Sequence, residues 1–452
     1  MPTNTTNPSF AHPVIATHDS ARTDAAHMGG VSRRGIRKLK RFGSAMVAAA
    51  GACITLPAQT PILVPTGISC TSRPTGGNAD DPHPVCQASA VVTHGPYLHA
   101  PTDSSATITW ITDVPSSARV LFGINGHLDR VAFATQHGMM SVGTLHSVRL
   151  SGLKPGQTYD YRVANMPVFE LTGYWPKTGI EQQSAIFPFT TFDPRKASVR
   201  FASITDTHEN LARIDTLMQH LKNDSLDFLV QTGDAFNDVR SEAQVFDKWL
   251  SPLIDGKLHH SMPLILARGN HDVRGPFARE FVKYVPVEED RYYFARDAGP
   301  VHLLVMDSGE DKPDSTQVYA SLNRFEAFRN EELTWFKRHT ATNARAKAAP
   351  FRIVVMHQAS WGWDWRSAAS DASRNEWIKA ANAAGVDLVI AGHNHTFSFA
   401  PAGTLGANYP MLVVGTDQVA KVQVTAKEIR VQVVGKDGGE VKAFTVPVKG
   451  RR

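Results

Sequence analysis

Cysteine is scarce in this chain of 452 residues, which has three, at positions 53, 70 and 86. None of them lies near the polar motifs described below, which excludes thiolate metal sites and cysteine nucleophiles. Cys53 falls in the first 58 residues, so Cys70 and Cys86 remain as a pair in a segment rich in proline, glycine and aspartate. In an oxidising compartment they can form a disulfide that contributes roughly 2 to 4 kcal/mol. The alternative is two free thiols in a linker.

An excess of positive charge is also missing from most of the chain. The formal net charge is +5, but residues 1–58 contain seven basic and two acidic side chains. The rest of the chain therefore has as many acidic as basic residues. A basic surface for nucleic acid is not implied, and we expect no nucleic-acid partner.

No apolar run is long enough for a permanent membrane anchor. Residues 42–54 are short and rich in alanine and glycine, and they follow the basic string Ser32-Arg33-Arg34-Gly35-Ile36-Arg37-Lys38. This arrangement is similar to a twin-arginine export signal, a pathway that carries folded proteins. We predict an export signal over residues 1–58, a mature chain that begins near Gln59, and a periplasmic or secreted protein. A disordered basic tail is the alternative. A lipoprotein signal at Cys53 lacks the larger aliphatic residue that is usual three positions earlier.

Two regions with different periodicity follow a linker, which we place at residues 59–88. Between residues 89 and 193 apolar and polar residues alternate in short runs divided by turn signals, which predicts an all-β sandwich. The clearest runs are residues 106–110, 118–122, 146–150 and 158–163. We expect Trp110 and Tyr161 to lie in its core.

Residues 197–449 form the second region, in which strand-like and helix-like segments alternate. Strands are expected at residues 200–205, 227–231, 263–267, 301–306, 351–356 and 386–391, and helices at 211–221, 242–253, 321–338 and 375–384. Residues 410–449 return to strands. Such alternation indicates a layered α/β sandwich.

Five polar motifs stand out in this second region. They are Asp206-Thr207-His208, Gly233-Asp234, Gly269-Asn270-His271-Asp272, the single His357, and Gly392-His393-Asn394-His395. Four of them directly follow an apolar run typical of a buried parallel strand, and α/β sheets build their sites beyond the carboxyl ends of such strands. Carboxylate, amide and imidazole donors suit ions such as Zn, Fe or Mn. Alone, the first motif could be a helix cap and His357 an ordinary buried histidine. Together they predict a site for two metal ions.

In this order, the motifs resemble those of the calcineurin-like metallophosphoesterases, and most of all the purple acid phosphatases and their bacterial relatives. The resemblance covers roughly residues 90–435. Gly95-Pro96-Tyr97-Leu98, Trp110 and the segment 153–159 resemble the fibronectin type III-like domain that precedes the catalytic domain in purple acid phosphatases. The implied fold is a four-layer α-β-β-α sandwich preceded by an all-β, fibronectin III-like sandwich.

The resemblance also implies roles for the motif residues. One ion would be held by Asp206, His208 and His395, and the other by Asn270, His357 and His393. Asp234 would bridge the two. His271 would be a catalytic residue that is not a ligand, giving a proton to the leaving oxygen or stabilising its charge, with Asp272 orienting it. The cofactors would be two divalent or mixed-valence ions of Fe, Zn or Mn.

The implied activity is hydrolysis of small phosphoric esters, as an acid phosphatase-like phosphomonoesterase with a metal-bound hydroxide. A phosphodiesterase or nucleotidase is the enzymatic alternative, with Trp361, Trp363 and Trp365 as an aromatic wall. A non-catalytic surface-binding protein is a further alternative, which the complete ligand set disfavours.

Two positions depart from the purple acid phosphatase pattern. His208 replaces a glycine, and Asn237 replaces a tyrosine ligand. These changes argue against trivalent iron, purple colour and a strictly acidic optimum.

Overall fold

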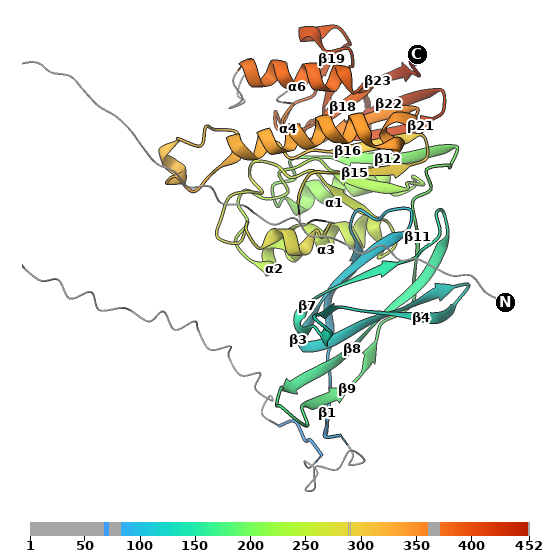
Figure 1. Ribbon diagram of the computed structural model, residues 1–452, viewed down its shortest axis with the longest axis vertical. Helices are drawn as coiled ribbons and strands as arrows, with labels where there is room; N and C mark the ends of the chain where they lie inside the picture. The colour runs from blue at the N-terminus through green and yellow to red at the C-terminus, as the bar shows by residue number, and fades with distance from the viewer. Residues whose placement is uncertain (1–66, 72–82, 288, 290, 360–370, 451–452) are drawn as a thin grey trace, which may run out of the picture. The chain divides into compact units, whose positions relative to one another are not determined.

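The computed structural model describes residues 67–71, 83–287, 289, 291–359 and 371–450 (Figure 1). The proposed export signal, most of the linker and the three tryptophans at 361, 363 and 365 lie outside the described residues. None of the helices in the described ranges is long and apolar enough to cross a membrane. The domain boundaries proposed above stay predictions.

Cys70 and Cys86 are joined by a disulfide, which confirms the expected pairing. Cys86 lies in strand β1 (Val85–Ser89) and is fully buried. The backbone N–H of Thr71 donates a hydrogen bond to the carbonyl of Val85, and that of Gln87 donates to the carbonyl of Ser69, which extends the contact on both sides of the bridge. The disulfide therefore fastens the end of the linker to the first strand.

The first domain is all β, as expected. Its strands are β2 (Val92–Leu98), β3 (Ser105–Ile124), β4 (His127–Phe133), β5 (Thr135–Gln136), β6 (Met139–Met140), β7 (Val142–Ser151), β8 (Thr158–Glu170), β9 (Lys177–Ile180), β10 (Gln182–Gln183) and β11 (Phe187–Thr190). Trp110 and Tyr161 are both fully buried in the apolar core of this domain, which confirms their predicted role. The indole Nε1 of Trp110 donates to Oδ1 of Asn165 at 2.7 Å, so its one polar atom is satisfied.

Strand β3 differs from the sequence prediction. Residues 106–110 and 118–122 were expected as two strands, but they belong to one strand whose two halves have different neighbours. The first half pairs with β2 and β7, and the second half pairs with β4 and β8. The pairing with β7 is interrupted between Ile111 and Ser116, around Pro115, which has no N–H to donate. The strand thus changes its partners along its length without a turn.

The second domain contains two six-stranded sheets. The first has the order β14 (Leu264–Leu266), β13 (Phe228–Gln231), β12 (Ser198–Ile204), β21 (Val419–Thr425), β22 (Glu428–Val434) and β23 (Glu440–Pro447). The second has the order β15 (Phe294–Ala298), β16 (Val301–Val305), β17 (Phe351–Val355), β18 (Leu388–Ala391), β20 (Met411–Val413) and β19 (Ser398–Ala400). Strands β12 to β14 are parallel, and so are β16, β17, β18 and β20.

Each sheet packs one face on the other sheet and one face on helices. Phe201 of β12 packs in the core that also contains Leu303 and Ile353 of the second sheet, whereas its neighbour Ala202 packs toward helix α1 (Leu211–Leu221). This is the alternation that a strand buried on both faces requires. The other sheet is covered by α4 (Phe325–Thr342) and α6 (Asp371–Ala383), as Figure 1 shows. The four-layer α-β-β-α prediction is confirmed.

Two predicted helices differ in detail. The segment 242–253 is not one regular helix but α2 (Glu242–Val245), a π-helical turn (Phe246–Leu250), α3 (Ser251–Leu253) and a second π-helical turn (Ile254–Leu258). Pro252 cannot donate to the carbonyl four residues back, and a wider turn accommodates its ring. Helix α4 begins at Phe325 instead of 321, because the side chain of Asp314 accepts from the N–H groups of Phe325 and Glu326. The remaining short helices are α5 (Ala344–Ala348), Phe281–Tyr284, Gln317–Tyr319 and Thr404–Gly406.

Candidate metal centre

The polar motifs lie in loops that follow parallel strands of both sheets. The loops after β12, β13 and β14 of the first sheet contain Asp206, Asp234 and Asn270. The loops after β17 and β18 of the second sheet contain His357 and His393. The structure brings these loops together, since Nε2 of His357 lies 3.1 Å from Oδ2 of Asp234. The site is therefore formed where the carboxyl ends of strands from two sheets meet.

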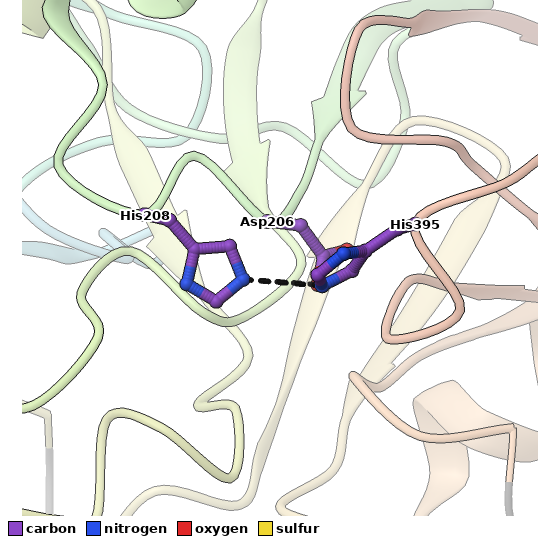
Figure 2. Close-up of side chains that lie close together, drawn as sticks. All are labelled: Asp206, His208 and His395. Carbon is purple, nitrogen blue, oxygen red and sulfur yellow. Dashed lines mark hydrogen bonds and ion pairs between the residues drawn. The ribbon is translucent and has the colours of Figure 1, made fainter.

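One set of donors consists of Asp206, His208 and His395, whose ligand atoms lie within 4.8 Å of one another. Oδ1 of Asp206 is 3.3 Å from Nε2 of His395 and 3.8 Å from Nε2 of His208. Figure 2 shows the two imidazoles directed toward the same space beside the carboxylate. Such a set could hold one metal ion.

The second set consists of Asp234, His357 and His393, again within 4.8 Å. Asn270 joins it, because its Oδ1 lies 3.0 Å from Nδ1 of His393. Asp234 also faces the first set, since its Oδ2 is 3.8 Å from Nε2 of His208. One carboxylate oxygen thus lies between histidines of both sets, which is the position that a bridging ligand requires.

Surrounding groups orient the two aspartates toward the centre. Oδ2 of Asp206 accepts from Oγ1 of Thr205 at 2.7 Å and from the backbone N–H of His393 at 3.0 Å. Oδ1 of Asp234 accepts from the N–H of His271 at 2.9 Å. The other oxygen of each carboxylate, Oδ1 of Asp206 and Oδ2 of Asp234, is left to bind a metal ion, and these two oxygens face the same space.

Backbone carbonyls fix the tautomers of two histidines. Nδ1 of His357 lies 2.8 Å from the carbonyl of Thr232, and Nδ1 of His208 lies 3.1 Å from that of Phe236. A carbonyl can only accept, so each Nδ1 carries the proton and each Nε2 keeps a lone pair for a metal.

The centre also attracts positive charge. Oδ1 of Asp206 and Nε2 of His357 are buried and make no hydrogen bond of good geometry among the described residues, although Nε2 of His395 lies 3.3 Å from the first and Oδ2 of Asp234 lies 3.1 Å from the second. An unpaired buried carboxylate oxygen is costly unless a cation lies beside it. Although burial works in the opposite direction, Asp234 and Asp206 raise the pKa of His357 to about 10. The donors present therefore fit metal ions.

Five residues of these motifs have an unusual backbone conformation. Asp206, His208, Asp234, His393 and His395 all have positive φ, between 46° and 74°. This conformation is unfavourable for residues other than glycine and is common at functional sites.

Two glycines of the motifs allow close packing around the donors. A Cβ on Gly233 would lie 2.3 Å from Nδ1 of His357, and one on Gly392 would lie 1.9 Å from Oγ1 of Thr205. Only glycine allows these close approaches.

His271 lies at the edge of the centre, and Asp272 does not contact its ring among the described residues. Asp272 is fully buried and accepts from the N–H groups of Gly269 at 2.8 Å and Phe236 at 3.3 Å. Burial and the nearby Asp234 raise the pKa of Asp272 to about 7. The expectation that Asp272 orients His271 is thus corrected: Asp272 connects two loops, because a buried carboxylate needs N–H donors.

Nδ1 of His271 instead donates to the carbonyl of Asn237 at 2.7 Å. The side chain of Asn237 contacts Oε1 of Glu209 and belongs to neither donor set. Its position is therefore consistent with the loss of the tyrosine ligand.

Two arginines near the site were not singled out in the sequence. Nη1 of Arg213, on α1, donates at 3.2 Å to the carbonyls of Asp206 and Thr207. Arg274 contacts the ring of His271, with Nη1 3.1 Å from Nε2. In the sequence, Arg213 was only part of a predicted helix. Arg274 lies two residues after Asp272, the end of a polar motif, and this proximity was the one sequence signal of a role at the site.

Both domains of the chain match known protein families. Residues 199–397, which include every donor above, match the family described as calcineurin-like phosphoesterase, and residues 96–191 match the purple acid phosphatase N-terminal domain. The human protein named acid phosphatase type 7 is 25% identical over 267 residues, which cover 56% of this chain and 56% of that protein. The chain thus spans little more than half the length of this relative.

A solved structure shows the same fold. It is a purple acid phosphatase from yellow lupin (Lupinus luteus) seeds, with 14% identity, a TM-score of 0.57, and coverage of 78% of this chain and 74% of the lupin chain. Each of the two domains thus matches a known family model: the second domain that of the calcineurin-like phosphoesterases, and the first that of the purple acid phosphatase N-terminal domain.

Proposed function

We propose that the protein hydrolyses small phosphoric esters, with phosphomonoesters as the preferred class, at a centre of two metal ions. Asp206, His208 and His395 would hold one ion, and Asn270, His357 and His393 would hold the other. Asp234 would lie between them. The observation that supports this most directly is the pair of adjacent donor sets, each with its ligand atoms within 4.8 Å of one another, and the oxygen Oδ2 of Asp234 that faces both.

The charges of the donors favour a phosphate substrate. The proposed ligands include two carboxylates, Asp206 and Asp234, so two divalent ions would leave the centre positively charged and able to attract an anionic ester. When bound, such ions activate a water molecule and polarise the phosphoryl oxygens. His271 lies beside His208, with ring centroids 5.0 Å apart, where it can donate a hydrogen bond to the leaving oxygen.

The test combines metal analysis with two substrates on one preparation. Protein loaded separately with zinc, manganese or iron should contain two ions per chain and cleave nitrophenyl phosphate faster than bis(nitrophenyl) phosphate. Asp215→Asn, an exposed position on α1, is the matched control and should behave as wild type. No cleavage of either ester by fully loaded protein would contradict the proposal and favour a binding protein. Faster cleavage of the diester would favour the phosphodiesterase alternative.

We further propose that the protein is exported to the periplasm or secreted. The disulfide between Cys70 and Cys86 supports this location, because such bridges persist in oxidising compartments. Mass spectrometry of the exported protein should find a chain that begins near Gln59 and has no alkylatable thiol at either position. A product that retains residue 40, or two free thiols, would contradict the proposal. The fibronectin III-like character of the first domain also stays a proposal.

A further inference from the structure

Arg274 is bound by two carboxylates on the side away from the metal centre. Its Nε donates to Oε2 of Glu310 at 2.8 Å, and Nη2 donates to the other oxygen of Glu310 and to Oδ1 of Asp311 at 2.9 Å. The remaining nitrogen, Nη1, faces His271, at 3.1 Å from Nε2 and 3.3 Å from Nδ1. The planar guanidinium therefore connects the loop after β16 to the ring of His271.

The loop that binds Arg274 is itself well fixed. Glu310 is 1% exposed. The carbonyls of Ser308 and Glu310 both accept from Nη1 of Arg329, which lies on α4 and is 8% exposed. Nε2 of Gln358, the residue after His357, donates to the carbonyl of Gly309 at 2.9 Å. Hydrogen bonds thus fasten the anchor of Arg274 to a helix and to a loop of the metal centre.

The ring of His271 is held at two points. Nδ1 donates to the carbonyl of Asn237, and Nη1 of Arg274 lies at nearly equal distances from the two ring nitrogens, which places it over the face of the ring and leaves Nε2 free to direct a proton toward the leaving oxygen. The N–H of Asn237 donates in turn to Glu209 at 3.0 Å. Two contacts on a planar ring define both its place and its rotation about the side-chain bonds.

The charges near Arg274 favour a positioning role over anion binding. Glu310 and Asp311 lie against its guanidinium and Asp311 also binds Lys312 at 2.6 Å, so two negative charges balance two positive ones and little positive charge remains to attract a phosphate. Three of its hydrogen bonds go to these carboxylates, and its side chain is 24% exposed. A substrate would meet a guanidinium that is already neutralised.

We propose that Arg274 is a positioning residue that holds the ring of His271 in its catalytic orientation, with Glu310 and Asp311 as its anchor. This inference rests on the proposed hydrolysis at the metal centre and assigns to Arg274 the orienting role that we expected of Asp272. It makes no claim on metal binding, because Arg274 contacts none of the proposed ligands.

The test is a double-mutant cycle of Arg274→Ala and His271→Ala, measured as kcat and KM on an alkyl phosphate with metal content determined for each protein. Arg274→Ala should lower kcat by roughly 10- to 100-fold, because a misplaced catalytic group can cost that much. Its metal content and KM should change little. In the His271→Ala background, the same change should cost less than about 3-fold, because the two residues act as a unit.

Two further variants separate position from charge. Arg274→Lys keeps a positive charge but cannot contact Glu310 and His271 together, so it should not restore the rate. Arg240→Ala removes an exposed arginine paired with Asp238 in a neighbouring loop, and it should leave kcat unchanged.

Independent, multiplying effects of the two alanine changes would overturn the proposal. So would recovery in Arg274→Lys, or a raised KM with unchanged kcat, since both results point to anion binding. If wild-type protein loaded with metal cleaves no phosphoester, the proposed function fails first. A crystal structure of Arg274→Ala then decides the inference alone: a His271 ring in its original place overturns it, and a turned ring supports it.

Discussion

Nε2 of His208 lies 3.2 Å from Nε2 of His395, although the two histidines come from loops of different sheets (Figure 2). The proton of His208 is on Nδ1, which faces the carbonyl of Phe236. Its Nε2 lone pair therefore points at the other imidazole. Two ring nitrogens are stable at this distance when a proton or a cation lies between them. With Oδ1 of Asp206 nearby, the pair is suited to a metal ion.

Asp234→Asn should reduce the metal content of both sites. The amide keeps the size of the carboxylate but removes its negative charge, and a neutral amide oxygen binds two cations far more weakly than the carboxylate oxygen Oδ2 does. We expect less than half of the wild-type metal after gel filtration and a corresponding loss of activity, measured by elemental analysis beside the Asp215→Asn control. Full occupancy in Asp234→Asn would rule out its bridging role.

His271→Ala should slow hydrolysis without releasing metal, because His271 belongs to neither donor set. General acid–base groups contribute about 10² to 10⁴-fold, so a loss of that order in kcat is expected for alkyl phosphates, whose leaving groups need a proton. Nitrophenyl phosphate should be affected less. Equal losses on both substrates, or loss of metal, would show that His271 has another role.

Iron-loaded protein should be colourless or pale. Asn237 stands where the tyrosine ligand is expected, and its side chain contacts Glu209. An amide has no phenolate to give intense charge transfer to iron. Visible absorption spectra of iron-loaded and zinc-loaded protein should therefore differ little. An intense band in the iron sample would mean that a tyrosine elsewhere is a ligand, and the ligand assignment would be wrong.

Acid should destabilise the first domain through His146. Burial lowers the pKa of this histidine from 6.5 to about 4. Between these values the unfolded chain binds more protons than the folded protein, so the free energy of unfolding falls as the pH drops from about 6.5 to 4. The loss is on the order of 2 to 3 kcal/mol at pH 4 and absent well above pH 6.5.

His146→Gln removes this titration and should make the pH dependence of the free energy of unfolding shallower, as measured by urea titrations at pH 7 and pH 4.5. His127→Gln changes an exposed histidine of the same domain and is the control. An unchanged pH dependence in His146→Gln would contradict the assignment.

The donors could be predicted from the sequence because they depend on local order. Asp234, for example, follows an apolar strand directly, and loops at the carboxyl ends of parallel strands converge whatever the rest of the fold does. Arg274 and Glu310 could not be paired in this way. Glu310 lies in a loop after β16 that no motif marks, and only the packing of two sheets shows that the loop reaches Arg274.

The fold was predictable in segments where the apolar residues recur at a single spacing, and less predictable where that spacing changes. Helix α1 has the predicted bounds, because its apolar residues recur at helical spacing and Asn210 caps its first turn. The continuity of β3 through Pro115 was missed, since Pro115 looks like the end of a strand in the sequence. Whether an interrupted strand turns or continues depends on its neighbours.

Because the donors come from both sheets, the metal centre can be complete only after the two sheets have packed together during folding. The donors run from Asp206 to His395, and each sheet alone supplies an incomplete set. A chain still being synthesised, or one whose sheets have not yet closed, can offer an incoming ion only part of its ligands. Full ligation of both ions would then have to wait until the two sheets have closed on each other.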